Sequence, residues 1–300
     1  MVVKSGHQGA KQRYLCKNCG KRFVLRKSLD TSRLWHEYIF GKQTLKELSD
    51  RYLISVSCVR RRLQKQKTVR IISSQKSVVV LMDTTYWGRN FGVMVFKDAH
   101  NKKILWRKFI DYETVTHYKE GIDWLENNGF EIQGIVCDGL RGMFSLSRQY
   151  KVQMCQYHQL KIVQRYLTKQ PELEASKELL YIAKLLTHSD KEHFIAMFEA
   201  WAAKWDKFLK ERSVDKKTKK SYFVHKKLRS AYLSIKRNML YLWTFYDYPQ
   251  RNIPNTNNAL EGQFANLKTK LRNHSGLSKK NRQLFIDEYF KHKNIAHFEH

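Results

Sequence analysis

The 300-residue sequence has little proline, few cysteines and no long apolar run, and each shortage excludes a class of protein. Only 3 prolines and as much as 13% aromatic residues argue against a disordered chain, because such a composition can bury a core. No apolar run reaches the roughly 18–20 residues of a membrane-spanning helix, and the first residues lack the apolar stretch of a secretion signal. Five cysteines without the spacing of a disulfide framework predict a reducing, cytoplasmic location.

Acidic residues are also scarce: 27 Asp and Glu face 57 Lys and Arg, which gives a formal net charge of +30. Residues 1–73 carry 18 basic and 4 acidic residues, and residues 161–254 carry 20 and 10, whereas residues 74–160 carry 11 and 9. This distribution predicts a nearly neutral core between two basic segments that hold a polyanion, most commonly nucleic acid. A generally basic, solvated exterior is the alternative.

The N-terminal segment contains one pair of cysteines, Cys16 and Cys19, in a CxxC spacing followed by Gly20 and Lys21. The pair resembles one knuckle of a zinc ribbon. A structural zinc needs four ligands, and no second CxxC precedes this one; His7 alone would contribute poorly. The prediction is a ribbon fragment without stably bound zinc, or a short hairpin with two free thiols.

Residues 29–73 carry the pattern of short helices around a tight turn. Thr44 and Glu47 form a predicted capping box, and Ser55 or Ser57 is expected to cap the next helix, which contains the run Arg60–Arg62. Such a pair of helices is typical of a helix-turn-helix, with Arg60, Arg61 and Arg62 contacting DNA. An ordinary helical hairpin is the alternative.

From residue 76 the pattern becomes that of strands. Strands are expected at 76–83, 91–98, 102–110, 131–139 and 151–158, with helices at 114–128 and 142–149. The first and fourth strands are expected to end on Asp83 and Asp138. The order β-β-β-α-β-α-β is that of the ribonuclease-H-like fold, whose first two metal-binding carboxylates fall at these positions.

The rest of the chain is expected to be helical. Over 161–252 apolar residues recur every three or four positions without a strand pattern, which predicts an all-helical insertion whose tryptophans pack in a core; stacking of those tryptophans on DNA bases is the alternative. After Pro254 a new helix is expected to carry Glu261 in its second turn. Two aspartates at adjacent strand ends and one acid on a facing helix would supply the oxygen ligands of a two-metal site for phosphodiester chemistry.

Four motifs in this order resemble a known family. They are LMDTTYWG around Asp83, IVCDGLRG around Asp138, MCQYHQL around Cys155 and His158, and NTNNALEGQFANLK around Glu261. Together they resemble bacterial insertion-sequence transposases of the DDE type, related to the Mutator-like superfamily. The resemblance spans about residues 10–295, although relatives with this N-terminus carry a complete zinc ribbon.

The resemblance implies an α/β protein, with a ribonuclease-H-like core of mixed sheet, an all-α insertion and a preceding helix-turn-helix. It implies a catalytic and metal-binding triad of Asp83, Asp138 and Glu261 with two Mg²⁺ or Mn²⁺ ions. Cys155 and His158 match a family signature and are expected to be a structural pair; zinc binding or direct help in cleavage are the alternatives. The implied partners are double-stranded DNA, both terminal inverted repeats and target DNA, and a second copy of the chain in a homodimer on that DNA. The implied location is the cytoplasm, in association with the nucleoid, and no membrane partner is expected. The expected regions are 1–28 (partial ribbon), 29–73 (helix-turn-helix), 74–160 and 253–300 (core), and 161–252 (insertion).

The implied activity is DNA cleavage and strand transfer, in which water and then a DNA 3′-hydroxyl act as nucleophiles. A catalytically inactive or domesticated DNA-binding protein derived from such a transposase is the first alternative, because binding alone needs no magnesium. A nuclease of the same fold is the second, which the long insertion and the helix-turn-helix disfavour.

Overall fold

The computed structural model describes residues 1–9, 11–24, 29–65, 76–140 and 142–296. It divides the chain into two compact units, one formed by Met1–Lys67 with Asn273–Leu284 and the other by Thr68–Arg272 with Phe285–His300. The expected boundaries at residue 28 and at 73–74 lie outside the described residues.

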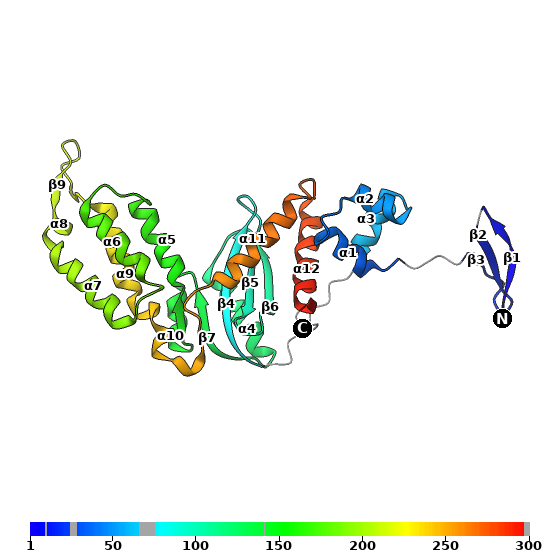
Figure 1. Ribbon diagram of the computed structural model, residues 1–300, viewed down its shortest axis with the longest axis horizontal. Coiled ribbons are helices and arrows are strands. Elements are labelled where there is room, and N and C mark those ends of the chain that lie inside the picture. Colours follow the sequence, from blue (N-terminus) through cyan, green and yellow to red (C-terminus); the bar gives the residue numbers. More distant parts are fainter. Residues whose placement is uncertain (10, 25–28, 66–75, 141, 297–300) are drawn as a thin grey trace. The chain divides into compact units, whose positions relative to one another are not determined.

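The first unit begins with an antiparallel three-stranded sheet and continues with three helices (Figure 1). The strands are β1 (Val2–Gln8), β2 (Lys11–Cys16) and β3 (Arg22–Val24), and the helices are α1 (Thr31–Ile39), α2 (Leu45–Tyr52) and α3 (Val56–Lys65). The predicted capping box of α2 is confirmed: Thr44 Oγ1 accepts from the Glu47 N–H at 3.2 Å, and Glu47 Oε2 accepts from the Thr44 N–H at 2.6 Å. Of the two serines expected to cap α3, Ser55 does so, because its Oγ accepts from the Cys58 N–H at 3.2 Å.

Residues 273–284 join this unit, although the sequence assigns all of 253–300 to the core. The reason is a buried histidine: His274 Nε2 contacts the Tyr38 carbonyl oxygen at 3.0 Å, and the two rings lie 4.1 Å apart. This contact joins residues 236 positions apart in the sequence.

The second unit is built on a mixed five-stranded sheet with the order β6-β5-β4-β7-β8 (Figure 1). The strands are β4 (Ser77–Tyr86), β5 (Gly92–Asp98), β6 (Ile104–Ile110), β7 (Glu131–Cys137) and β8 (Val152–Met154). β4 is antiparallel to β5 and β5 to β6, whereas β4, β7 and β8 run parallel. The expected α/β class and the five strands in their expected order are confirmed, including helix α4 (Val115–Asn127) and the 3₁₀ helix η1 (Met143–Arg148).

Two strand ends differ from expectation. β4 does not end on Asp83, because Thr84, Thr85 and Tyr86 continue to pair with β5. β8 is short, since α5 (Gln156–Leu167) begins directly after Cys155 and buries a stripe of residues at helical spacing. His158 therefore lies on a helix and not at the end of a strand.

The segment between β8 and α11 is mostly helical (Figure 1). Its helices α5, α6, α7 and α9 enclose a second apolar core. The remaining elements are α6 (Glu174–Leu185), α7 (Lys191–Lys204), α8 (Asp206–Lys210), β9 (Arg212–Val214), β10 (Ser221–Phe223), α9 (Lys226–Leu242), α10 (Thr244–Asp247) and η2 (Pro249–Arg251). Trp201 is buried in this core, as expected, and Trp205, the other tryptophan of the predicted apolar stripe, is half-buried against it.

The expectation of helix throughout this segment is wrong at one place, because β9 and β10 form an antiparallel hairpin. Asp215 closes its turn by accepting from the backbone N–H groups of Lys217 and Thr218 at 2.9 and 2.7 Å. The guanidinium groups of Arg212 and Arg229 stack on the ring of Phe223.

Two final helices complete the second unit, α11 (Asn258–Arg272) and the part of α12 (Lys279–Ala296) that follows Leu284. α11 lies against β4 (Figure 1). α12 buries Phe285, Ile286, Tyr289 and Phe290, and its Asn294 Oδ1 accepts from the Ile104 N–H at 2.8 Å. The faces of the sheet follow from strand alternation: Val78, Val80 and Met82 of β4 pack in one core with α4, so Asp83 points to the opposite face.

Candidate functional site

Asp83 and Asp138 are brought together by the parallel register of β4 and β7. Leu81 pairs with Val136, an offset of 136 − 81 = 55 residues, and Asp138 follows Asp83 by the same 138 − 83 = 55. Asp83 lies on β4 and Asp138 directly follows β7, so the parallel pairing brings the two aspartates to the same end of neighbouring strands. The charge of Asp138 therefore acts on the carboxyl group of Asp83, although 55 positions separate the two residues in the sequence.

Asp83 is almost completely buried, with 7% of its surface exposed. Burial is the main cause that raises the pKa of its carboxyl group well above the usual value, and the carboxylates of Asp138, Glu261 and Glu113 raise it further. The backbone N–H of Thr84 opposes this by donating to Asp83 Oδ1 at 2.7 Å. Asp83 is thus the centre of a group of acids whose mutual repulsion is only partly compensated within the protein.

Asp138 follows the last residue of β7 and is half-buried. Its Oδ1 accepts from the backbone N–H of Leu140 at 3.1 Å, which closes a tight turn. Gly139 allows this turn, since its φ is +84° and a Cβ at this position would lie 2.7 Å from Met154 Cε. The positive φ therefore favours glycine after the aspartate, and a larger residue would also displace the end of the Met154 side chain.

Glu261 lies in the first turn of α11, one turn earlier than expected, because the helix begins at Asn258 and not directly after Pro254. Asn257 fixes this end of the helix, since it is fully buried and its Nδ2 donates to the Met82 carbonyl oxygen at 2.8 Å. The start of α11 is thereby attached to β4 at the residue before Asp83.

A second attachment comes from β5. The buried Lys97 donates from Nζ to the Ala259 carbonyl oxygen at 3.0 Å. Burial, followed by the charges of Lys102 and Lys293, lowers the pKa of Lys97 to about 8. The backbone that carries Glu261 is thus held at two points of the sheet.

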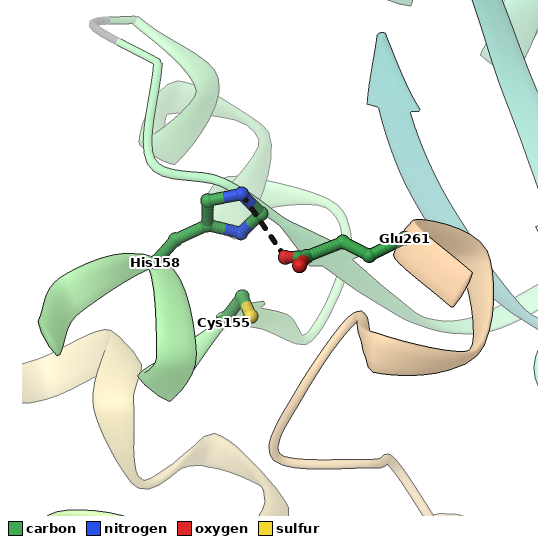
Figure 2. A group of neighbouring side chains, drawn as sticks. All are labelled: Cys155, His158 and Glu261. Atoms are coloured by element: carbon green, nitrogen blue, oxygen red, sulfur yellow. Dashed lines mark ion pairs between the residues drawn. The ribbon is translucent and has the colours of Figure 1, made fainter. Parts of the chain in front are cut away.

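Glu261 meets Cys155 and His158, the two residues of the CxxH motif (Figure 2). His158 Nε2 lies 3.3 Å from Glu261 Oε1, and one ligand atom from each of the three residues lies within 4.8 Å of the other two. Cys155 is buried at the start of α5, and His158 is on its first turn. The sequence predicts the pair Cys155 and His158; that Glu261 joins it was not expected.

The expected triad is brought into electrostatic range but is not one tight cluster. The charges of Asp138 and Glu261 both act on Asp83. Across the described parts of the chain, the only group of three or more His, Cys, Asp or Glu ligand atoms within 4.8 Å of one another is Cys155, His158 and Glu261.

Sequence reasoning missed a fourth acid, Glu113, which precedes α4. Its carboxylate accepts a hydrogen bond from Tyr118 Oη, and its pKa is raised by burial and by the charge of Asp138. Tyr118 Oη also lies 3.4 Å from Thr84 Oγ1. In the sequence Glu113 resembles an ordinary acid before a helix cap, so no local pattern distinguishes it.

The predicted DNA-contacting arginines lie on α3 as expected. Arg60 and Arg61 are exposed, whereas Arg62 is half-buried and its Nε has no hydrogen-bond partner among the described residues. Two of the three are therefore free to reach a ligand on this face.

Cys16 and Cys19 lie at the turn after β2, where the Gly20 N–H donates to the Cys16 carbonyl oxygen at 2.8 Å. Hydrogen bonds from the backbone N–H groups of Cys19 and Asn18 lower the pKa of the Cys16 thiol. No third ligand atom from the described residues joins the two thiols in a group within 4.8 Å, so a complete zinc site is not formed by them.

Comparisons with known proteins add no assignment. No protein-family model matches the chain, and no curated protein sequence matches it either. In the described part of the chain no helix is both long and apolar enough to cross a membrane.

Proposed function

We propose that this protein is a bacterial insertion-sequence DNA transposase of the DDE type, related to the Mutator-like superfamily, with a ribonuclease-H-like catalytic core. The strand order β6-β5-β4-β7-β8 supports this, with its antiparallel first three strands and parallel last two. So does the helical segment between β8 and α11, which separates Asp138 from Glu261 in the sequence.

The observation that carries the proposal is that the charges of Asp138 and Glu261 both act on the buried carboxyl group of Asp83. Carboxylates gathered around a buried carboxylate are unfavourable unless cations or protons neutralise them. Asp83 is the buried member, and Asp138 and Glu261 both act on it from other elements. A protein that only binds DNA has no need for such a group.

The donor set fits Mg²⁺ or Mn²⁺, since all three residues offer carboxylate oxygens, the ligands that these ions prefer. The three carboxylates need not share a single ion, because the two ions of such sites are ~3.5–4 Å apart. Asp83, Asp138 and Glu261 would together hold the ions, with Asp83 as the buried member of the group. When bound, the ions would activate the attacking oxygen and stabilise the leaving one on a phosphodiester.

The chain's own residues would hold these ligands and the DNA. Asn257 and Lys97 fix the helix that carries Glu261, and the turn at Gly139 fixes Asp138. The excess of basic residues would draw the phosphate backbone toward the chain. Arg60 and Arg61 on α3 are candidates for contact with the ends of the element.

The test is nicking and strand transfer by the full chain on plasmid DNA that carries the sequences flanking its gene, in Mg²⁺ or Mn²⁺. Asp83→Asn, Asp138→Asn and Glu261→Gln should each abolish cleavage and leave DNA binding intact. Glu131→Gln is the matched control, because this exposed acid begins β7 at the far end of the strand from Asp138.

Two outcomes would count against the proposal. One is an Asp138→Asn protein that still nicks DNA at the wild-type rate. The other is wild-type protein that binds DNA equally well with EDTA and with Mg²⁺ but never cleaves it, which would indicate the inactive DNA-binding protein.

A further inference from the structure

The group formed by Cys155, His158 and Glu261 has a donor set unlike that of the aspartates. It offers one sulfur, one imidazole nitrogen and one carboxylate oxygen, all within 4.8 Å of one another (Figure 2). We propose that these three side chains bind a Zn²⁺-class transition-metal ion, at a site that shares Glu261 with the carboxylates proposed to hold Mg²⁺ or Mn²⁺.

The geometry is close to that of a tetrahedral zinc site. Zinc bonds of ~2.0–2.3 Å to nitrogen, oxygen and sulfur put neighbouring ligands of a tetrahedron ~3.3–3.6 Å apart. The separation of His158 Nε2 and Glu261 Oε1 is 3.3 Å. Cys155 Sγ lies within 4.8 Å of a ligand atom of each of the other two residues.

Two buried polar atoms at this point lack hydrogen-bond partners among the residues that the structure describes. They are His158 Nδ1 and Glu261 Oε1. Although Glu261 Oε1 is close to His158 Nε2, the two are not aligned as donor and acceptor. An unpartnered buried polar atom is costly, and a metal ion bound between these side chains would satisfy the glutamate oxygen.

The surroundings of Cys155 favour a thiolate ligand. The Asn257 N–H donates to Cys155 Sγ at 3.2 Å, and the backbone N–H groups of Tyr157 and His158, at the start of α5, also point at this sulfur. Burial nevertheless raises the pKa of the free thiol to about 11. The thiol proton must therefore leave to solvent as the sulfur–metal bond forms, and the positive ion replaces the missing compensation.

The softness of the donors determines which ion is bound. Thiolate and imidazole select Zn²⁺ and related ions over Mg²⁺, which prefers oxygen. Three protein ligands would leave a fourth position for an exchangeable water. Metal binding here does not rest on the proposed function, although the site shares Glu261 with it.

The test uses the full chain with Cys16→Ser and Cys19→Ser as the parent, so that the N-terminal thiols cannot contribute. Co²⁺ is the spectroscopic probe, and Zn²⁺ is used to displace it. The parent should show the intense visible bands of four-coordinate Co²⁺ and a near-ultraviolet sulfur-to-cobalt charge-transfer band, both lost when Zn²⁺ is added.

Three variants and one control assign the ligands. Cys155→Ser should lose the charge-transfer band, whereas Cys137→Ser, which changes a fully buried thiol on the adjacent strand, should keep it. His158→Gln and Glu261→Gln change partly exposed residues, which keeps the test valid should Cys155→Ser fail to fold. Each should weaken Zn²⁺ binding by at least roughly 100-fold, since losing even a supporting partner of a metal ligand costs 10–100-fold.

Weak six-coordinate cobalt bands in the parent, or a charge-transfer band that survives in folded Cys155→Ser, would overturn the inference. So would unchanged Zn²⁺ affinity in both His158→Gln and Glu261→Gln. Nicking in Mg²⁺ by a parent without cobalt bands refutes this site alone, whereas cobalt bands without nicking refute only the proposed function.

Discussion

The buried Lys97 allows a quantitative prediction about stability and pH. Lys97 is only 6% exposed, and its ammonium group donates to the Ala259 carbonyl oxygen at the start of α11. Burial lowers its pKa from 10.5 to about 8, so the folded protein releases this proton before the unfolded chain does. Between these pH values the unfolded state binds more protons, and the stability of the fold therefore rises with pH.

The magnitude follows from the difference between the two pKa values. A fall from 10.5 to about 8, at about 1.36 kcal/mol per pH unit, corresponds to roughly 3 kcal/mol. Relative to Lys97→Met, which carries no titrating group, the wild-type protein should gain this amount as pH rises from about 7 to 10.5. The variant also lacks the hydrogen bond from Lys97 to the Ala259 carbonyl oxygen. This loss changes the difference in unfolding free energy by a constant amount over the lower part of this pH range.

The assay is urea unfolding of wild type and Lys97→Met at several pH values, in reducing buffer with EDTA. The quantity of interest is the difference in unfolding free energy between the two proteins, because groups that titrate in both cancel. Lys207→Met, at an exposed position of α8, is the matched control and should give a difference independent of pH. A flat difference for Lys97→Met over the same range would refute the account of Lys97 as a buried, destabilised ammonium group.

Three further predictions concern the charges of the candidate site and of the surfaces that we propose to bind DNA. Asp83→Asn should raise the stability of the metal-free protein by about 1–2 kcal/mol at neutral pH. The gain should disappear toward pH ~4, where the Asp83 carboxyl group is protonated in the unfolded wild-type chain as well. Denaturant unfolding in EDTA measures this gain, and a variant no more stable than wild type at neutral pH would argue against repulsion at Asp83. Changing Arg60 and Arg61 to Gln should reduce the slope of log DNA affinity against log salt concentration by about one for each phosphate that the variant no longer neutralises. Fluorescence anisotropy measures this slope, and an unchanged slope would exclude α3 from the interface. The turn of the β9–β10 hairpin should contact DNA phosphates, so that affinity falls and catalytic metal binding is unaffected when four exposed lysines are changed to Gln, namely Lys216, Lys217, Lys219 and Lys220.

Local patterns were sufficient for most of the secondary structure. Thr44 and Glu47 formed the predicted capping box, because a cap depends only on residues three positions apart. The β-branched run before Asp83 formed a buried strand, since β-propensity acts along the chain. The same reasoning failed at the ends: β4 continued past Asp83 because its partner β5 extended the pairing, and a partner strand is not visible locally.

The hairpin at β9 and β10 shows the same limit. Its turn has a local cause in Asp215, but its strands are only three residues each and sit between helices. The stacking of Arg229 of the next helix on Phe223 supports the hairpin from outside it. Whether such short strands form depends on tertiary contacts and not on the pattern of their own residues.

For the candidate site, the sequence by itself determined which residue types are present and that Asp83 and Asp138 each belong to, or directly follow, a buried strand. The tertiary structure decided which of these side chains meet. Register placed the two aspartates side by side, Asn257 attached the helix of Glu261 to β4, and the start of α5 brought Cys155 and His158 to the same glutamate. Glu113 entered the group only through burial beside Asp138. The physical reason is that a pKa or a metal site depends on distances through space and on the exclusion of solvent, whereas a sequence pattern records only distances along the chain.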